Sequence, residues 1–455
     1  MTTKHILLNA FNMNCVGHIN HGHWTHPRDT SDQYHTLRYW TELAQLLERG
    51  LFDGLFIADI VGVYDVYQGG VDVTLRESVQ LPVNDPVPLV SAMAAVTRHL
   101  GFGLTANLTY QAPYLFARTL STLDHLSEGR VGWNIVTGYL DSAARAMGLD
   151  EQIAHDERYD RADEYLEVLY KLWEGSWEDG AVRRDRQARV YADPSKVHKI
   201  RHAGRHYRVE GYHLSEPSPQ RTPVLYQAGS SGRGQRFAAR HAECVFISPP
   251  NKEVGRKIVR DLREQVAQAG RHPDDVKIFM GAAVVVAPTQ AEARDKHAEY
   301  LRHAAPEAGL AHFSASTGID YGRYGLDDPV GYGPTNAIES ATRVAREHNW
   351  TRRDLLAQFS LGGRYPAIVG DPATVADALQ DWVRDTGVDG FNLSRIVTPE
   401  SYADFIDLVV PVLQDRGVYK TAYEAGTLRQ KLFGQGDRLP ARHEGAHHRH
   451  LARPA

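Results

Sequence analysis

The feature that most constrains the fold of this chain is a regular alternation of short apolar segments with amphipathic ones. The stripe formed by Leu37, Trp40, Leu43, Ala44 and Leu47 predicts a helix that ends at Gly50. Further helical patterns follow at Pro88–Leu100, Tyr114–Leu126 and Tyr159–Trp173. Eight segments between such helices are typical of buried strands: Ile6–Phe11, Leu55–Ala58, Gly101–Leu108, Val131–Val136, Thr222–Tyr226, Val245–Ile247, Lys277–Val286 and Gly390–Leu393. Eight strands that alternate with helices predict an α/β fold, the (β/α)8 or TIM barrel.

Three long stretches exceed what a minimal barrel needs. They lie near residues 64–83, 174–220 and 305–350, and we expect them to be insertions at the C-terminal face that can act as lids. We expect residues 1–434 to form one barrel domain. The remaining residues, 435–455, are polar and rich in histidine, so we expect a flexible tail whose histidines bind no metal because nothing fixes them.

Composition narrows the function classes. The chain has 455 residues and a formal net charge of -5, which argues against a nucleic-acid partner or an acidic membrane surface. It shows no apolar stretch of membrane-spanning length and no signal peptide. Its two cysteines, Cys15 and Cys244, cannot form a disulfide framework, so we expect a cytoplasmic protein.

One turn is suited to binding a phosphate group. The segment 227–234, Gln-Ala-Gly-Ser-Ser-Gly-Arg-Gly, follows the fifth predicted strand and opens a helix. Small residues at such a turn let backbone N–H groups converge at the positive end of the helix dipole. The turn lacks the Lys-Ser/Thr ending of a P-loop and the spacing of a dinucleotide fingerprint, which favours a mononucleotide over ATP or NAD. A plain connecting turn remains the alternative.

Polar residues gather where the predicted strands end, which is where barrel enzymes place their chemistry. Asp59, Thr105 and Asn134 end the second, third and fourth strands. His155 and Tyr159 lie four residues apart on one face of a helix start, where they would suit an anion, although His155 could simply cap the helix. His21 and His23 invite a metal interpretation, but the later strand ends offer no further ligands, and we expect no metal site.

Three longer strings carry a family resemblance. They are the residues 123–137, 155–164 and 218–229, which read LDHLSEGRVGWNIVT, HDERYDRADE and SPQRTPVLYQAG. At these residues the chain resembles the bacterial luciferase-like, flavin-dependent monooxygenases, in the branch of the nitrilotriacetate and dibenzothiophene-sulfone monooxygenases. Residues 9–18, 64–67, 170–179 and 431–434 resemble the long-chain alkane monooxygenases of that family in particular.

The resemblance implies a cofactor, a mechanism and a set of site residues. It implies a two-component enzyme that receives reduced FMN (FMNH2) from an NAD(P)H:flavin reductase and inserts one atom of O2 into an organic substrate through a C4a-peroxyflavin. The family's flavin contacts match Asp59, Thr105, Asn134, His155, Tyr159, Ser230 and Ser231, and its substrate-pocket residues match Cys15, His18, Tyr64, Gln80 and His312. Relatives suggest a homodimer or homotetramer.

Two departures bear on the substrate. Gly138 stands where relatives carry serine, and Tyr139 stands where the alkane enzymes carry histidine. Apart from Arg76, no arginine or lysine lies in the loops Cys15–His26 and Tyr64–Gln80 to bind several carboxylates, which favours an apolar or neutral substrate. Sulfur- or nitrogen-containing substrates, a deazaflavin (F420)-dependent oxidoreductase and a non-catalytic flavin-binding protein remain the alternatives.

Overall fold

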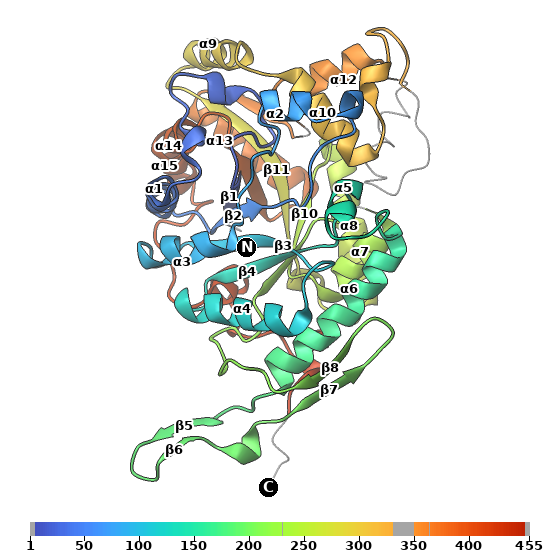
Figure 1. Ribbon diagram of the computed structural model, residues 1–455. Coiled ribbons are helices and arrows are strands. Elements are labelled where there is room, and N and C mark those ends of the chain that lie inside the picture. The colour runs from blue at the N-terminus through green and yellow to red at the C-terminus, as the bar shows by residue number, and fades with distance from the viewer. Residues whose placement is uncertain (1–4, 230, 331–349, 364, 451–455) are drawn as a thin grey trace.

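The computed structural model describes residues 5–229, 231–330, 350–363 and 365–450. Its centre is a closed barrel of eight parallel strands, in the order β1-β2-β3-β4-β9-β10-β11-β13 and back to β1 (Figure 1). The eight strands are β1 (Leu7–Met13), β2 (Gly54–Ala58), β3 (Gly101–Asn107), β4 (Val131–Val136), β9 (Val224–Gln227), β10 (Cys244–Ile247), β11 (Lys277–Val286) and β13 (Gly390–Ser394). They coincide with the eight predicted segments, so the TIM-barrel prediction is confirmed.

Helices cover the outside of the barrel, one after each strand. They are α1 (Leu37–Arg49), α3 (Val87–Ala95), α4 (Pro113–Leu126), α6 (His155–Tyr170), α7 (Gly232–His241), α8 (Lys252–Gln268), α13 (Pro372–Thr386) and finally α14 (Glu400–Asp404) with α15 (Val410–Asp415). In α1, Trp40 and Leu47 are buried as the stripe predicts, whereas Leu37 is 63% exposed because it is the first residue of the helix. Among the helices of the described residues, none is long and apolar enough to cross a membrane.

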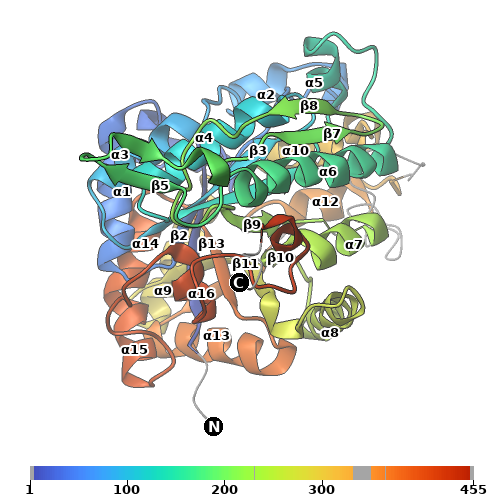
Figure 2. The same ribbon diagram turned by 90° about the horizontal axis from the view of Figure 1, so that it is seen from below.

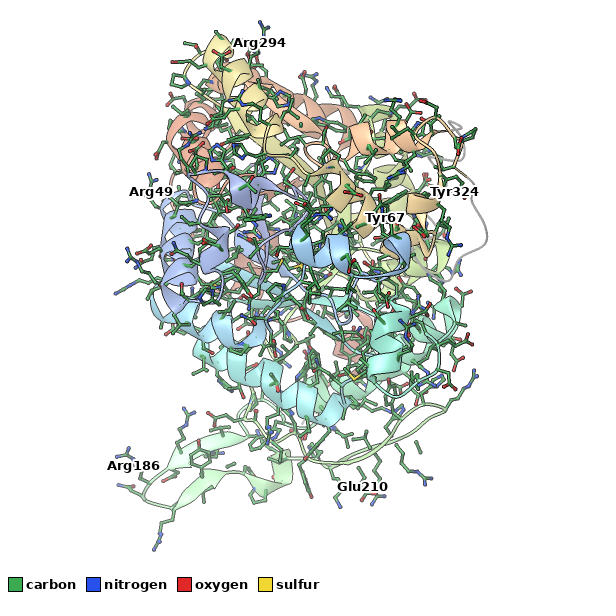
Figure 3. The ribbon with its side chains drawn as sticks, turned by 45° about the horizontal axis from the view of Figure 1, so that its top comes forward. Arg49, Tyr67, Arg186, Glu210, Arg294 and Tyr324 are labelled. Carbon is green, nitrogen blue, oxygen red and sulfur yellow. The ribbon has the colours of Figure 1, made fainter. Side chains whose placement is uncertain are left out.

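The described parts of two insertions form a cap over the C-terminal ends of the strands. Residues 64–83 contain α2 (Asp72–Arg76), and the segment after α9 (Gln290–Leu301) contains α10 (Pro306–Thr317) and α12 (Arg352–Gln358). A separate apolar core joins them, in which Tyr67, Phe313 and Tyr321 are buried. Figure 3 places Tyr67 and Tyr324 together in this cap. The strand β12 (Ala367–Gly370), which the sequence did not predict, extends the sheet beside the end of β11.

The third insertion lies at the opposite end, so its predicted place at the C-terminal face is wrong. Residues 174–220 follow a helix, α6, and lead into the start of β9, and connections of that kind run at the N-terminal face. They form two antiparallel hairpins, β5 (Val182–Asp185) with β6 (Val190–Ala192) and β7 (Ile200–Ala203) with β8 (Arg208–Gly211). Figures 1 and 3 show both hairpins on the far side of the barrel from the cap.

The same end of the barrel is closed by α16 (Leu428–Phe433) and the chain that follows it (Figure 2). Arg429 is buried there and forms two hydrogen bonds with the buried carboxylate of Glu243, at 2.6 Å and 2.8 Å. Its guanidinium also donates to the carbonyl oxygen of Thr222 at 2.9 Å. This ion pair fastens the helix to the N-terminal ends of β9 and β10.

The tail differs from the flexible arm expected from its composition. His443 is fully buried and donates its Nε2 hydrogen to the carbonyl oxygen of His241 at 2.9 Å. A short 3-10 helix, Glu444–His448, follows it. Arg442 pairs with Asp275 and Arg449 with Glu174, whose carboxylate is buried. Up to residue 450, the tail packs against the rest of the protein because its arginines neutralise carboxylates of distant segments.

Candidate functional site

The predicted site residues separate into two groups at the C-terminal ends of the strands. One group lies around the turn after β9 and the ends of the neighbouring strands, and the other lies under the cap. Ser230 falls outside the described residues. The first group comprises Asp59, Thr105, Asn134, His155, Tyr159 and Ser231, and the second comprises Cys15, His18, Tyr64, Gln80 and His312.

The turn after β9, which we call the anion seat, brings together groups that are suited to binding an anion. Ser231 caps α7, and its Oγ accepts a hydrogen bond from the backbone N–H of Gly234 at 3.0 Å. His155, at the start of α6, places its Nε2 3.3 Å from the same hydroxyl oxygen. Gln227 donates to the hydroxyl of Tyr159 at 3.4 Å. Imidazole, hydroxyl and helix-start groups therefore converge from two helices and one strand, which suits a phosphate group.

The space in this seat depends on glycine. A Cβ atom at Gly234 would lie 2.7 Å from the hydroxyl oxygen of Tyr159, and one at Gly229 would lie 2.2 Å from Nε2 of Gln227. The guanidinium of Arg233 lies 5.5 Å from the centre of the Tyr159 ring and is itself paired with Asp160 and Asp163. Only residues without a side chain leave the tyrosine hydroxyl accessible here.

A second polar pair lies inside the barrel mouth on neighbouring strands. Thr105 of β3 and Asn134 of β4 face each other in register, and Nδ2 of Asn134 donates to Oγ1 of Thr105 at 3.0 Å. Oδ1 of Asn134 is buried and has no hydrogen-bond partner among the described residues. A buried acceptor of this kind suits an N–H at the edge of a bound ring. Burial raises the pKa of Asp59, at the end of β2, to about 6.

Under the cap, side chains of three different segments form one chain of contacts. The hydroxyl of Tyr64 donates to Oε1 of Gln80 at 2.7 Å, and its ring stacks on His312 of α10 with 4.9 Å between centroids. Nδ1 of His312 lies 3.3 Å from Nε2 of His21. The structure thus unites three of the predicted pocket residues and adds His21. The sequence singled out His21 only as a possible metal ligand.

The other two predicted pocket residues are buried in the first loop. Burial raises the pKa of the Cys15 thiol to about 12, and its Sγ donates to the carbonyl oxygen of Gly17 at 3.2 Å. Cys15 therefore remains a protonated thiol at neutral pH. Burial lowers the pKa of His18 well below its ordinary value, and the His18 ring contacts Phe11 edge-on at 4.5 Å. His18 is accordingly a neutral imidazole.

A buried arginine that the sequence analysis did not single out holds this first loop in place. Arg395, directly after β13, donates through Nη2 to the carbonyl oxygen of Cys15 at 2.8 Å. Its Nη1 donates to the hydroxyl of Tyr39 at 3.1 Å, and its own carbonyl accepts from Asn20 at 2.7 Å. The sequence could have indicated this role of Arg395, because a lone arginine directly after an apolar strand needs partners at the barrel mouth.

A small cavity that is open to solvent lies between the first loop and α10. Its lining is mostly apolar, and burial lowers the pKa of His21 to about 3, so that imidazole is neutral. Such a lining favours a neutral or apolar ligand over an anion. The lining residues are Ile19, His21, Gly309, His312, Phe313, Phe359 and Gly363.

The first loop also sets the position of α10. Gly22 has a φ of 90°, and a Cβ atom there would lie 2.4 Å from the carbonyl oxygen of His303. This close approach lets the N–H of Ala305 donate to the carbonyl oxygen of His21 at 3.0 Å. The backbone before α10 is therefore hydrogen-bonded to a pocket residue.

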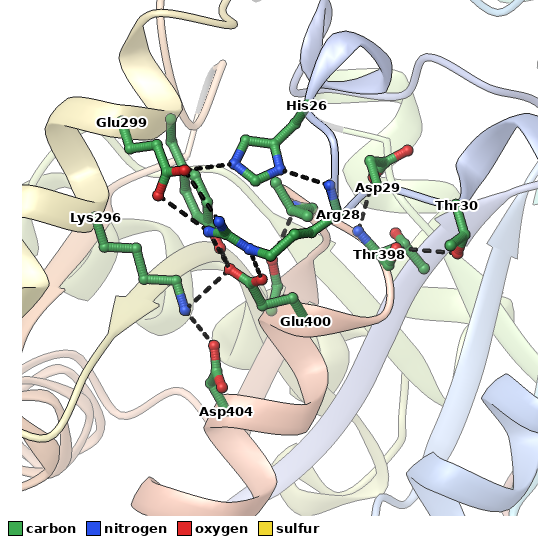
Figure 4. A network of polar contacts seen from close by, with 12 residues as sticks. His26, Arg28, Asp29, Thr30, Lys296, Glu299, Thr398, Glu400 and Asp404 are labelled. Carbon is green, nitrogen blue, oxygen red and sulfur yellow. Dashed lines mark hydrogen bonds and ion pairs between the residues drawn. The ribbon is translucent and has the colours of Figure 1, made fainter.

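An ion-pair network strengthens this attachment (Figure 4). Arg28 lies between Glu299 of α9 and Glu400 of α14, with both nitrogens of its fork 3.0 Å from the Glu299 oxygens. Lys296 approaches Glu400 at 3.2 Å. Burial would raise the pKa of Glu400, but hydrogen bonds from Arg28 and other neighbours lower it to about 2. The network joins the first loop, the cap and the last barrel helices at neutral pH.

Comparison with known proteins gives consistent matches over nearly the whole chain. The family described as luciferase-like monooxygenase matches residues 18–390. The chain is 51% identical over 451 residues to the dimethyl-sulfide monooxygenase of Hyphomicrobium sulfonivorans, covering 98% of this chain and 94% of that protein. It is 50% identical over 451 residues to the long-chain alkane monooxygenase of Geobacillus thermodenitrificans (strain NG80-2), covering 99% of each.

One solved structure bears on the cofactor. It is a riboflavin lyase crystallised with modified FMN and riboflavin, with a TM-score of 0.93 and 38% identity. The match covers 98% of this chain and 100% of the lyase. A flavin-binding protein therefore shares this fold over nearly its whole length.

Proposed function

Because the chain belongs to the luciferase-like monooxygenase family, we propose that it is a two-component monooxygenase that uses FMNH2 supplied by a separate NAD(P)H:flavin reductase. In this proposal it inserts one atom of O2 into an apolar or neutral organic substrate. We further infer a cytoplasmic enzyme that assembles as a homodimer or homotetramer. Its membership of the family makes it a flavin-dependent enzyme.

The observation that carries the cofactor assignment is the anion seat at the start of α7. His155, Tyr159 and Ser231 would hold the phosphate of FMN, since their polar atoms converge beside the N–H groups of the helix start. Asn134 and Thr105 would meet the polar edge of the flavin ring, because Oδ1 of Asn134 is buried and lacks a partner among the described residues. Ser230 remains a proposed phosphate contact.

Asp59 has a defined part in this proposal. Its carboxyl group ends β2 at the barrel mouth, and its raised pKa allows it to exchange a proton near pH 6. We propose that it hydrogen-bonds to the bound cofactor. A half-buried carboxyl group that has no ion-pair partner among the described residues is suited to that contact.

Bound FMNH2 supplies the activation of O2. The residues under the cap would bind the substrate and exclude water. Tyr64 and Gln80 hold each other through one hydrogen bond, so they would shape one wall of the pocket. His312 and His18 would offer hydrogen bonds to the substrate or to oxygen, and the protonated thiol of Cys15 would fill the first loop without reacting.

The pocket bears on the substrate class. The residues that line it are apolar apart from two imidazoles, which supports a neutral substrate. The match to an alkane monooxygenase supports a hydrocarbon, whereas the match to a dimethyl-sulfide monooxygenase supports a sulfur compound as the second candidate. A nitrogen-containing compound is a third candidate for the same class of reaction.

The proposal is tested with a panel of alkanes, organic sulfides, sulfones and amines. Each is incubated with the protein, FMN, NADH and a flavin reductase, and both product and hydrogen peroxide are measured. A true substrate yields product and lowers the peroxide formed per NADH. If every compound leaves the peroxide yield unchanged and no product forms, the monooxygenase proposal is wrong for these substrates.

Two further measurements separate the rival functions. Tight binding of FMNH2 with no affinity for a reduced deazaflavin supports the monooxygenase, and the reverse preference supports a deazaflavin-dependent oxidoreductase. A non-catalytic flavin-binding protein would bind FMN but show no substrate-dependent loss of peroxide. His312→Ala is expected to raise the peroxide yield, and unchanged, fully coupled turnover would remove His312 from its proposed role.

A further inference from the structure

A group of metal-binding side chains lies at the end of the barrel away from the cap. Among the residues that the structure describes, Glu178, His198 and His450 place one donor atom each within 4.8 Å of one another. Oε1 of Glu178 is 2.7 Å from Nε2 of His198. The rings of His198 and His450 have their centroids 4.1 Å apart. Two imidazoles and one carboxylate thus meet from the 174–220 insertion and the tail.

The backbone holds Glu178 and His198 beside each other. Trp177 and Val197 form an antiparallel bridge, and the N–H of Glu178 donates to the carbonyl oxygen of Lys196 at 2.9 Å. The N–H of His198 donates to the carbonyl oxygen of Ser176 at 2.7 Å. Two of the three donors are therefore fixed on adjacent backbone segments before any ion binds.

The third donor is held by its neighbours in the tail. Arg449, the residue before His450, pairs with the buried carboxylate of Glu174 and donates to the carbonyl oxygen of Leu439 at 2.9 Å. His443 is buried earlier in the same segment. We expected the tail histidines to bind no metal because we expected the tail to be mobile. Since these contacts hold the tail in place, that reason no longer applies. Figure 1 shows the end of the described chain beside the hairpins of the insertion.

We propose that Glu178, His198 and His450 bind a Zn²⁺ ion that clips the C-terminal tail to the 174–220 insertion. Imidazole nitrogen and carboxylate oxygen are ligands that Zn²⁺ prefers, and a water molecule would complete a tetrahedral site. Bonds of about 2.0–2.1 Å place tetrahedral ligands roughly 3.3 Å apart. The donor atoms now lie within 4.8 Å of one another, and rotation of these half-buried or exposed side chains would bring them to that spacing.

The ion would act on the structure and not on the reaction. The three donors lie at the N-terminal face of the barrel, whereas the proposed flavin seat and pocket lie at the C-terminal face. The proposal is therefore independent of the proposed function. Its consequence is a tail that is held more firmly when zinc is present.

Isothermal titration of the chelator-treated, full-length protein with Zn²⁺ tests the site. We expect one ion per chain, with a dissociation constant in the micromolar range or below. His450→Gln and Glu178→Gln should each weaken binding at least tenfold. His447→Gln is the matched control, because His447 is exposed on the same tail and belongs to no such cluster, and it should leave the affinity unchanged.

A second measurement reports on the tail itself. Zn²⁺ should slow the removal of the C-terminal residues by a carboxypeptidase in the parent protein and in His447→Gln, but not in His450→Gln. Three results overturn the proposal: the absence of stoichiometric binding, an equal loss of affinity in His447→Gln and His450→Gln, or tail cleavage that zinc does not slow. Equal loss would indicate unspecific binding by a histidine-rich tail.

Discussion

Replacing Gly234 by alanine is expected to weaken FMN binding. The new Cβ atom would lie 2.7 Å from the hydroxyl oxygen of Tyr159 and 3.1 Å from the Cα atom of Gly229. The Tyr159 ring packs against Phe237 with 5.4 Å between centroids, so the hydroxyl cannot withdraw without moving the ring. The substitution therefore displaces the group that is proposed to contact the phosphate.

The size of the effect follows from that one contact. A hydrogen bond to a charged group contributes about 1.5–3 kcal/mol. Its loss raises the dissociation constant roughly 10- to 150-fold, since about 1.4 kcal/mol corresponds to a factor of ten. The same clash acts on folding, because Tyr159 is buried and its ring must move to accept the new Cβ atom. The expected signature is therefore weaker binding at a temperature where the thermal unfolding curve shows the variant still folded.

The assay is a fluorescence titration of FMN with each variant, together with a thermal unfolding curve of each without ligand. Gly232→Ala is the matched control, because it lies in the same first turn of α7 and the nearest atom to its new Cβ is Nη1 of Arg236 at 3.7 Å. It should bind FMN like the parent protein. Equal affinities of Gly234→Ala and Gly232→Ala would refute the assignment of this turn as the phosphate seat.

Three further predictions concern stability. Arg429→Met should lower the free energy of unfolding, measured by urea denaturation, by about 3–5 kcal/mol, because it leaves the carboxylate of Glu243 buried and unpaired. The double variant with Glu243→Gln should recover part of this loss. A loss below about 1 kcal/mol for the single variant would contradict the reasoning. The pKa of Asp59 is about 6 in the folded state against 3.8 ordinarily, so its protonation favours folding below about pH 4, and that contribution is lost as the pH rises through 6. Asp59→Asn should therefore raise the urea midpoint at pH 7 and leave it unchanged at pH 4, and equal shifts at both pH values would argue against the raised pKa. Gly22→Ala should lower the melting temperature more than Gly148→Ala, since both glycines have φ near +85° but only Gly22 has atoms within 4 Å of the new Cβ; equal losses would show that backbone strain alone decides.

The barrel was predictable because the buried faces of strands and helices require apolar residues at regular, short spacings in the sequence. Each strand is apolar over four to ten residues, and the helices between them carry an apolar face, so the order of elements specifies the fold class. The position of the 174–220 insertion follows from the same order. The insertion comes after the helix at Tyr159–Trp173 and not after a strand. Because connections that lead from a helix to the next strand run at the N-terminal face, the order of elements alone places the insertion there.

The tail and parts of the site were not predictable, since they depend on contacts between distant residues. Arg442 and Asp275 are 167 positions apart, and Arg449 and Glu174 are 275 apart, so no local pattern reveals the pairs that order the tail. The same holds for His21, whose contact with His312 spans 291 positions. The residue type of His21 suggested a metal ligand. Only the folded structure shows that His21 lines the pocket and is hydrogen-bonded to His312.

The buried ion pair beneath β9 and β10 has a consequence for how the chain matures on the ribosome. Glu243 lies 186 positions before its partner Arg429, and β1 pairs with β13 near the end of the chain. At about 5–20 residues per second, translation of that interval takes roughly 10–40 s. During this time the nascent chain carries an open sheet edge and an unneutralised carboxylate. Closure of the barrel is therefore a late event in synthesis, and earlier release of the chain would expose both to aggregation or to chaperones.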